Sequence, residues 1–103
     1  MSDPVKAIAG RLRRRCDRFA TLHVDRAESR VWRSLLFDGA RHDIRLRLAG
    51  PAVMTAMDML RAALDDPDFT IAGHIVAEMR LGAVERDGED AILSLDALTI
   101  EAL

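Results

Sequence analysis

The chain has 103 residues, the size of one domain covering residues 1–103, and half of these residues are apolar while 31% are charged. This balance excludes disordered, collagen-like and mucin-like chains, and charged residues interrupt every apolar run before it is long enough to cross a bilayer. The net charge is only −2, but residues 1–50 carry 12 basic and 6 acidic side chains, whereas residues 51–103 carry 3 and 11.

The compartment of the protein is predicted from its cysteine content and its first residues. A single cysteine, Cys16, cannot close an internal disulfide, and an oxidising compartment usually selects against a leftover thiol. The early acid Asp3 and the interrupted apolar segments behind it are not typical of a secretory signal. We therefore expect a cytoplasmic protein that has no membrane partner.

The first predicted element is a helix over about residues 4–22. Ser2-Asp3-Pro4 is a typical helix start, because a short polar side chain accepts the first free N–H groups and Pro4 costs no hydrogen bond there. An apolar stripe follows at steps of three and four residues: Val5, Ile8, Leu12, Cys16, Phe19 and His23. The same period places a set of arginines on one flank of the helix: Arg11, Arg14, Arg15 and Arg18.

The second predicted element is a hairpin over about residues 30–48. From Ser29 the apolar period changes to two, which predicts a strand as far as Phe37, and Asp38-Gly39 is a typical turn dipeptide. The returning strand alternates strictly, so that three apolar residues should point inward and the arginines between them outward: Ile44, Leu46 and Leu48 against Arg45 and Arg47.

Gly50-Pro51 then breaks the strand and begins a second helix over about residues 51–65. Its buried stripe comprises Val53, Met57, Leu60 and Leu64.

A long hairpin over about residues 70–101 completes the chain, with apolar residues or glycine at odd positions from 69 to 83 and a turn at 86–90. The return strand changes its apolar parity to Leu98 and Ile100, which predicts a β-bulge near Asp96-Ala97 and a matching bend at Gly82.

The element order α-β-β-α-β-β predicts an α+β fold. Two hairpins should form one antiparallel sheet, and the two helices should cover one face of it.

Chemical motifs give no positive signal in this sequence. The glycines are isolated from one another, and no serine lies in a nucleophile elbow. Among the histidines we expect His23 at the end of the first helix's stripe, His42 in solvent near the first turn and His74 on the second face of the sheet. No two of them should share a site, so the sequence predicts no catalytic residue, no metal and no cofactor.

The basic segment at residues 11–18 has two interpretations. Four or five clustered arginines can neutralise the phosphates of a nucleic acid. The preferred interpretation pairs them with the acidic second half of the same assembly, which supplies Asp58, Asp65, Asp66, Asp68, Glu85, Glu89 and Asp90.

Self-association is the function that the sequence favours. Trp32, Leu36 and Val76 have the opposite sheet parity from the main core residues, and the last hairpin is long enough to project, so a second copy should cover apolar surface. We expect a non-enzymatic, homo-oligomeric interaction or assembly module, most simply a dimer. The alternatives are a nucleic-acid-binding protein that uses the arginine helix and a small-molecule-binding domain lined by Met54, Met57 and Met59.

Overall fold

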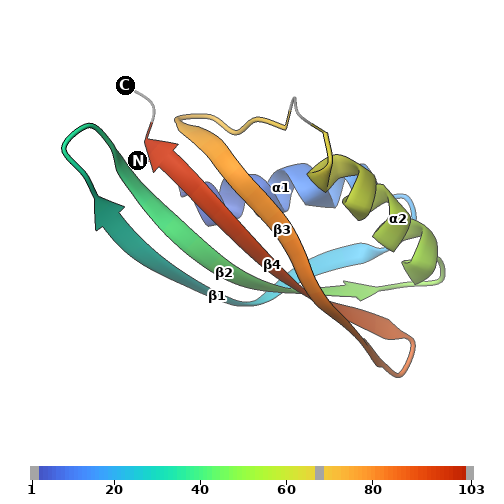
Figure 1. Cartoon of the computed structure of the whole chain (residues 1–103). Coiled ribbons are helices and arrows are strands. Elements are labelled where there is room, and N and C mark those ends of the chain that lie inside the picture. The colour runs from blue at the N-terminus through green and yellow to red at the C-terminus, as the bar shows by residue number, and fades with distance from the viewer. Residues whose placement is uncertain (1–2, 67–68, 102–103) are drawn as a thin grey trace.

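Figure 1 shows the computed structural model, which describes residues 3–66 and 69–101 as two helices on one face of a four-stranded antiparallel sheet. The predicted α+β class and the order α-β-β-α-β-β are confirmed. None of the described helices is long and apolar enough to cross a membrane. The elements are α1 (Pro4–Cys16), β1 (Thr21–Arg33), β2 (Asp38–Ala49), α2 (Val53–Leu64), β3 (His74–Asp87) and β4 (Asp90–Glu101).

The sheet has the strand order β1-β2-β4-β3, so β2 and β4 are central while β1 and β3 form the two edges. The two hairpins point in opposite directions, and their turns lie at opposite ends of the molecule (Figure 1). Because the strands are 12–14 residues long, the molecule is elongated, with extents of 47 × 23 × 22 Å. The helices cover only part of this length, which leaves one end of the sheet without a helix layer.

Helix α1 starts where the sequence predicts, because Asp3 Oδ1 accepts hydrogen bonds from the backbone N–H groups of Val5 (3.0 Å) and Lys6 (3.4 Å). The predicted end near residue 22 is wrong, since α1 ends at Cys16 and the chain then turns. Phe19 and His23 therefore lie outside the helix. From Thr21 the backbone pairs with β2 instead, and this tertiary pairing overrides the helical spacing of the apolar residues.

The first hairpin also differs from its prediction, because its turn lies at residues 34–37 and Asp38-Gly39 belong to β2. Ser34 closes the turn, since its N–H donates to the Phe37 carbonyl (2.9 Å) and its hydroxyl oxygen accepts from the Phe37 N–H (3.0 Å). Gly39 is required for close packing rather than for the turn. A Cβ there would lie 2.5 Å from the Thr99 carbonyl oxygen.

The last hairpin carries its irregularities on β3 and not on β4. The bulge predicted near Asp96-Ala97 is wrong, because β4 alternates without interruption and its buried helix-side residues include Ala97 and Thr99. Two register shifts lie in β3 instead, between Val76 and Glu78 and between Leu81 and Val84, and the second contains Gly82 as predicted. The apolar pattern of β4 predicted the wrong face for its last residues. Thr99 faces the helices and is hydrogen-bonded to His42, whereas Leu98 and Ile100 face away from the helices.

The first register shift also explains why the odd positions of β3 do not share one environment. Ile75 is exposed, whereas Val76 packs against the core. After the bulge, Met79 and Leu81 return to the helix side. The predicted uninterrupted apolar face over residues 69–83 is therefore wrong at Ile75 and at Ala83, which are exposed, whereas Phe69 and Ile71 are buried in the core.

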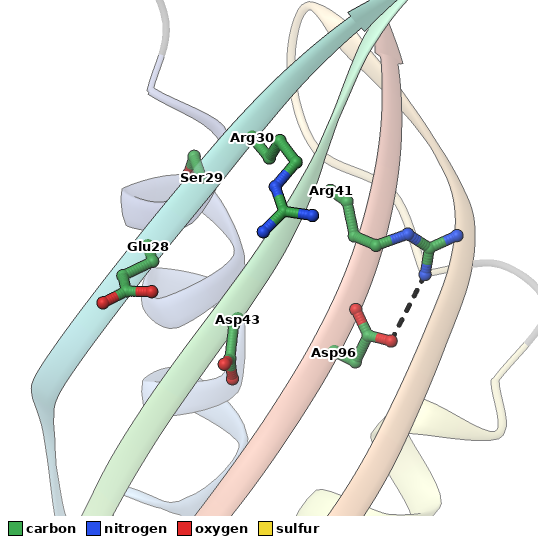
Figure 2. A pocket seen from close by; sticks show the side chains of 6 residues that line it. All are labelled: Glu28, Ser29, Arg30, Arg41, Asp43 and Asp96. Carbon is green, nitrogen blue, oxygen red and sulfur yellow. Dashed lines mark hydrogen bonds and ion pairs between the residues drawn. The ribbon is translucent and has the colours of Figure 1, made fainter.

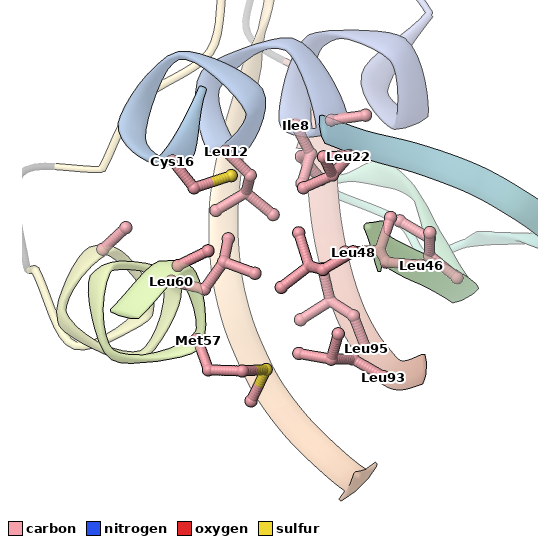
Figure 3. Packing of buried hydrophobic residues seen from close by; sticks show 14 of the residues in the cluster. Ile8, Leu12, Cys16, Leu22, Leu46, Leu48, Met57, Leu60, Leu93 and Leu95 are labelled. Carbon is pink, nitrogen blue, oxygen red and sulfur yellow. The ribbon is translucent and has the colours of Figure 1, made fainter. Parts of the chain in front are cut away.

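The core lies between the two helices and the helix-facing side of the sheet (Figure 3). Met57 and Leu60 of α2 point into it as predicted, and Cys16 is a buried member of the α1 stripe. Burial raises the pKa of the Cys16 thiol, with a smaller contribution from the charge of Asp17. The sheet contributes the inward residues of its two central strands and the start of β1: Leu22, Ile44, Leu46, Leu48, Leu93 and Leu95.

Candidate functional site

The face of the sheet away from the helices, which we call the open face, is built from cross-strand charge pairs. Arg41 on β2 lies 3.2 Å from Asp96 of β4 and 3.7 Å from Glu78 of β3. Arg41 and Asp96 line a shallow hollow of about 690 Å³. Figure 2 shows this pair on the open face, with α1 behind the sheet. The Arg41–Asp96 pair is diagonal, because Arg41 stands opposite Leu98 of β4. Directly opposite positions of the open face also hold like charges, such as Asp43 opposite Asp96 and Arg30 opposite Arg41.

A second group of open-face pairs centres on Arg47 of β2. Its guanidinium lies 3.3 Å from Asp25, 3.1 Å from Asp87 and 3.0 Å from Asp90. The hydrogen bond to Asp90, followed by that to Asp87, raises the pKa of Arg47 above its ordinary range. The basic first half therefore pairs with the acidic second half mainly through the arginines of β2, a partner set that the sequence interpretation missed because it concentrated on the helix.

Of the arginines predicted on one flank of the helix, Arg11, Arg14 and Arg15 lie in α1 at steps of three and four residues, and Arg18 lies beyond its end. Arg15 lies 3.2 Å from Asp66, one of the predicted acidic partners, and the Arg11 guanidinium lies 5.8 Å above the Phe69 ring. Arg14 is exposed on the helix. In addition, Arg13 Nε donates to the Leu22 carbonyl oxygen at 3.1 Å, so these side chains attach α1 to its surroundings.

The three apolar candidates for an interface lie in three different environments. Trp32 lies on the open face with its ring against Gly39, and Leu36 lies in the β1–β2 turn with its side chain 80% exposed. Val76 faces the helices and packs against the core. Their shared parity in the sequence therefore does not place them on one surface, because a turn and a bulge intervene.

A polar row crosses the helix-facing side of the sheet, and two of its members, His42 and Thr99, are buried. His42 of β2 has its Nδ1 2.7 Å from Ser29 Oγ of β1 and its Nε2 2.8 Å from Thr99 Oγ1 of β4. The expectation that His42 lies in solvent is wrong, since the side chain is only 1% exposed. Because β2 begins at Asp38, His42 is an inner residue of a central strand and not a turn residue.

The surroundings of His42 disfavour its charged form. Burial lowers the pKa of His42, the nearby charge of His74 lowers it further, and Asp3 opposes both effects. His42, His74 and Asp3 line one groove of about 570 Å³, so the expectation that no two histidines share a site is wrong. His74 lies on the helix-facing side because the bulge after Val76 reverses the parity, whereas His23 is an exposed residue of β1.

The row is a hydrogen-bond chain from Ser29 through His42 to Thr99. A catalytic imidazole that accepts a proton is usually stabilised by a carboxylate at its other nitrogen. In this row both ring nitrogens of His42 contact neutral hydroxyls, and burial disfavours the imidazolium. The arrangement orients Ser29 at the sheet edge and links three strands.

The stability of the protein should fall when His42 is protonated. Its folded-state pKa lies below the ordinary value of 6.5, so the stability that the neutral ring contributes is complete above about pH 6.5 and is lost as the pH falls towards the folded-state pKa. Urea unfolding between about pH 7.5 and about pH 5 measures this loss. The pH slope should be smaller in His42→Gln but retained in the control His23→Gln. Equal slopes in all three proteins would contradict the assignment.

The end of the sheet beyond the helices carries an exposed apolar surface. Leu35 is 103% exposed, and Leu36, Phe37 and Ile75 are each more than half exposed. These four residues line a shallow groove of about 440 Å³ together with Ile100, and we call the five the apolar end. The sequence interpretation found only Leu36 of this group, because the turn was placed after Phe37 and Ile75 was assigned to the core.

Comparisons with models of known protein families, with curated proteins and with solved structures found no match to this chain.

Proposed function

We propose that the protein is a non-enzymatic cytoplasmic assembly module that works as a homo-oligomer, most simply a twofold dimer. The observation that supports this function is the apolar end. Isolated exposed apolar side chains are common on protein surfaces, but contiguous groups of them mark interaction sites. The apolar end is contiguous, since residues of the β1–β2 turn, β3 and β4 line a single groove.

The high exposure of two leucines in the β1–β2 turn supports a contact with another chain. Leu35 is 103% exposed, so folding of the single chain removes none of its side chain from water. Neighbouring Leu36 is 80% exposed. Two adjacent leucines at the tip of an ordered hairpin gain hydrophobic stabilisation only when another surface covers them.

The contacts of the arginines favour a protein partner over a nucleic acid. Arg15 and Arg11 contact Asp66 and Phe69, and Arg13 donates to a backbone carbonyl. Binding a phosphate backbone through α1 would replace these contacts. The open-face arginines Arg41 and Arg47 are likewise already paired with carboxylates.

Light scattering at micromolar concentration tests the proposal. The native protein should have twice the mass of one chain. Leu36→Asp should shift the equilibrium towards monomer by roughly tenfold or more, since about 1.4 kcal/mol of lost association energy corresponds to a factor of ten.

The matched control is Met54→Asp. Met54 is also exposed, but it lies in the first turn of α2, where an acidic residue is compatible with the helix and the apolar end is not touched. This variant should associate like the native protein. A native protein that stays monomeric at these concentrations would refute the proposed function.

A further inference from the structure

The two edge strands of the sheet differ in how well another strand can pair with them. Edge strands expose unpaired backbone N–H and C=O groups, and natural proteins commonly protect such edges with bulges. Edge strand β3 has two register shifts, at Val76/Glu78 and Leu81/Val84. Edge strand β1 has a single shift, between Val24 and Arg26, and then pairs regularly as far as Arg33. The β1 edge is therefore the one that remains regular.

The regular part of β1 is also open to solvent. Every residue from 23 to 31 is exposed, including the β-branched Val31 with 69% exposure. Ala27, Ser29 and Val31 alternate on the helix-facing side, whereas Glu28 and Arg30 point to the open face. The β1 edge therefore exposes backbone N–H and C=O groups for pairing with another strand. It carries small or apolar side chains on the helix-facing side and charged side chains on the open face.

We propose that residues 26–32 of β1 pair antiparallel with the same residues of a second copy, with a twofold axis at Ser29. This inference rests on the proposed homo-oligomeric function and names β1 as the strand through which two chains pair. The turn residues of the apolar end lie next to this strand, whereas Ile75 and Ile100 lie on β3 and β4 and stay outside the β1 contact. The two four-stranded sheets would join into one continuous sheet, with the helices of both copies on the same side.

The order of charges along β1 selects this register. Directly opposite residues of an antiparallel pair lie on the same face of the sheet, so their side chains interact. With the axis at Ser29, Glu28 of each copy lies opposite Arg30 of the other, and Ala27 lies opposite Val31. Within its own chain Glu28 pairs with Arg26, and across β2 Glu28 and Arg30 face like charges, Asp43 and Arg41. An axis at Glu28 would place two glutamates opposite each other, and an axis at Arg30 would do the same with two arginines.

An axis at Ala27 is the remaining complementary register. It would pair Arg26 with Glu28 of the second copy, but the regular run would end at once, because the next residue is at the Val24/Arg26 shift. The Ser29 register uses the whole run from 26 to 32 and covers the exposed Val31. It also brings the β1–β2 turn, which carries Leu35 and Leu36, towards the start of the second copy's β1.

Engineered cysteines measure the register. Ser29→Cys should form an intermolecular disulfide under mild oxidation, because residues opposite each other have Cα atoms about 4.5–5.5 Å apart and disulfides need about 4.4–6.8 Å. The matched control is Ala27→Cys, two residues away on the same face. In the Ser29 register the two copies of residue 27 are offset by four residues, about 14 Å, and should not cross-link. The native Cys16 is buried, so the unsubstituted protein shows how much cross-linking occurs without an engineered cysteine.

Each outcome of this experiment has a separate meaning. A dimer that cross-links through residue 29 and not through residue 27 supports the inference. A dimer that cross-links at 27 alone, or at neither position, overturns the inference while the proposed function stands. A native protein that is monomeric overturns both.

A charge exchange gives a second measurement that needs no cysteine. Glu28→Arg places like charges opposite each other twice in the dimer and should weaken association at least tenfold. Adding Arg30→Glu in the same chain restores opposite charges across the axis and should recover most of the affinity. Loss of association that the second substitution does not rescue would overturn the Ser29 register.

Discussion

Met57→Ala is expected to lower the free energy of unfolding by about 2–5 kcal/mol, the range for truncating a buried methionine to alanine. The Met57 side chain is 1% exposed and reaches from α2 towards Leu93 and Leu95 of the sheet (Figure 3). Removing it leaves a cavity in the main core, where the helices and the central strands meet. Urea denaturation at constant protein concentration measures the loss.

Met54→Ala is the matched control for this experiment. It makes the same chemical change on the same helix, but Met54 is 57% exposed and alanine is the better helix former. The unfolding free energy of Met54→Ala should stay within about 0.5 kcal/mol of the native value. If both variants lose the same amount, the assignment of the buried face of α2 is incorrect.

Gly39→Ala is the second substitution for which we expect a large effect. The added Cβ would lie 2.5 Å from the Thr99 carbonyl oxygen and 2.7 Å from the Trp32 ring. The first of these is a backbone atom of the neighbouring central strand, so the methyl group can be accommodated only if β2 and β4 move apart. Overpacking of this kind typically costs about 1–3 kcal/mol, occasionally more.

The fluorescence of Trp32, the single tryptophan of the chain, should also change in Gly39→Ala because its ring packs against this glycine. Gly82→Ala provides the control. A Cβ at Gly82 would meet Ser94 at 3.5 Å, an ordinary contact, and the effect on stability should be small. An unchanged fluorescence spectrum and unchanged stability in Gly39→Ala would contradict the packing of Trp32 on β2.

The elements whose local pattern agrees with their environment could be predicted well from sequence. In β2 the alternation of Ile44, Leu46 and Leu48 with arginines matches a strand that has a core on one face and water on the other. The start of α1 follows from Asp3 and Pro4, whose effects operate within one turn of helix. Such features depend on neighbours in the chain and are visible in a single sequence.

The polar row was the least predictable part of the site. His42 and Thr99 have polar side chains, so a hydrophobicity pattern assigns them to solvent or breaks the strand at their position. They can be buried because they form a hydrogen bond with each other, between strands β2 and β4, which are far apart in the chain. For the same reason the sequence suggested a bulge in β4, where a threonine occupies a core-facing position.

The chain's composition and short-range patterns were sufficient for the fold class, the element order and the membership of most of the core. Tertiary pairing set the remaining features: β1 starts at Thr21 and not near residue 30, and the bulges lie in β3. It also determined which charges meet, since Arg47 pairs with Asp25, Asp87 and Asp90 from three separate segments. Burial periodicity acts along the chain, whereas strand register and the satisfaction of buried polar groups depend on residues that are brought together by folding.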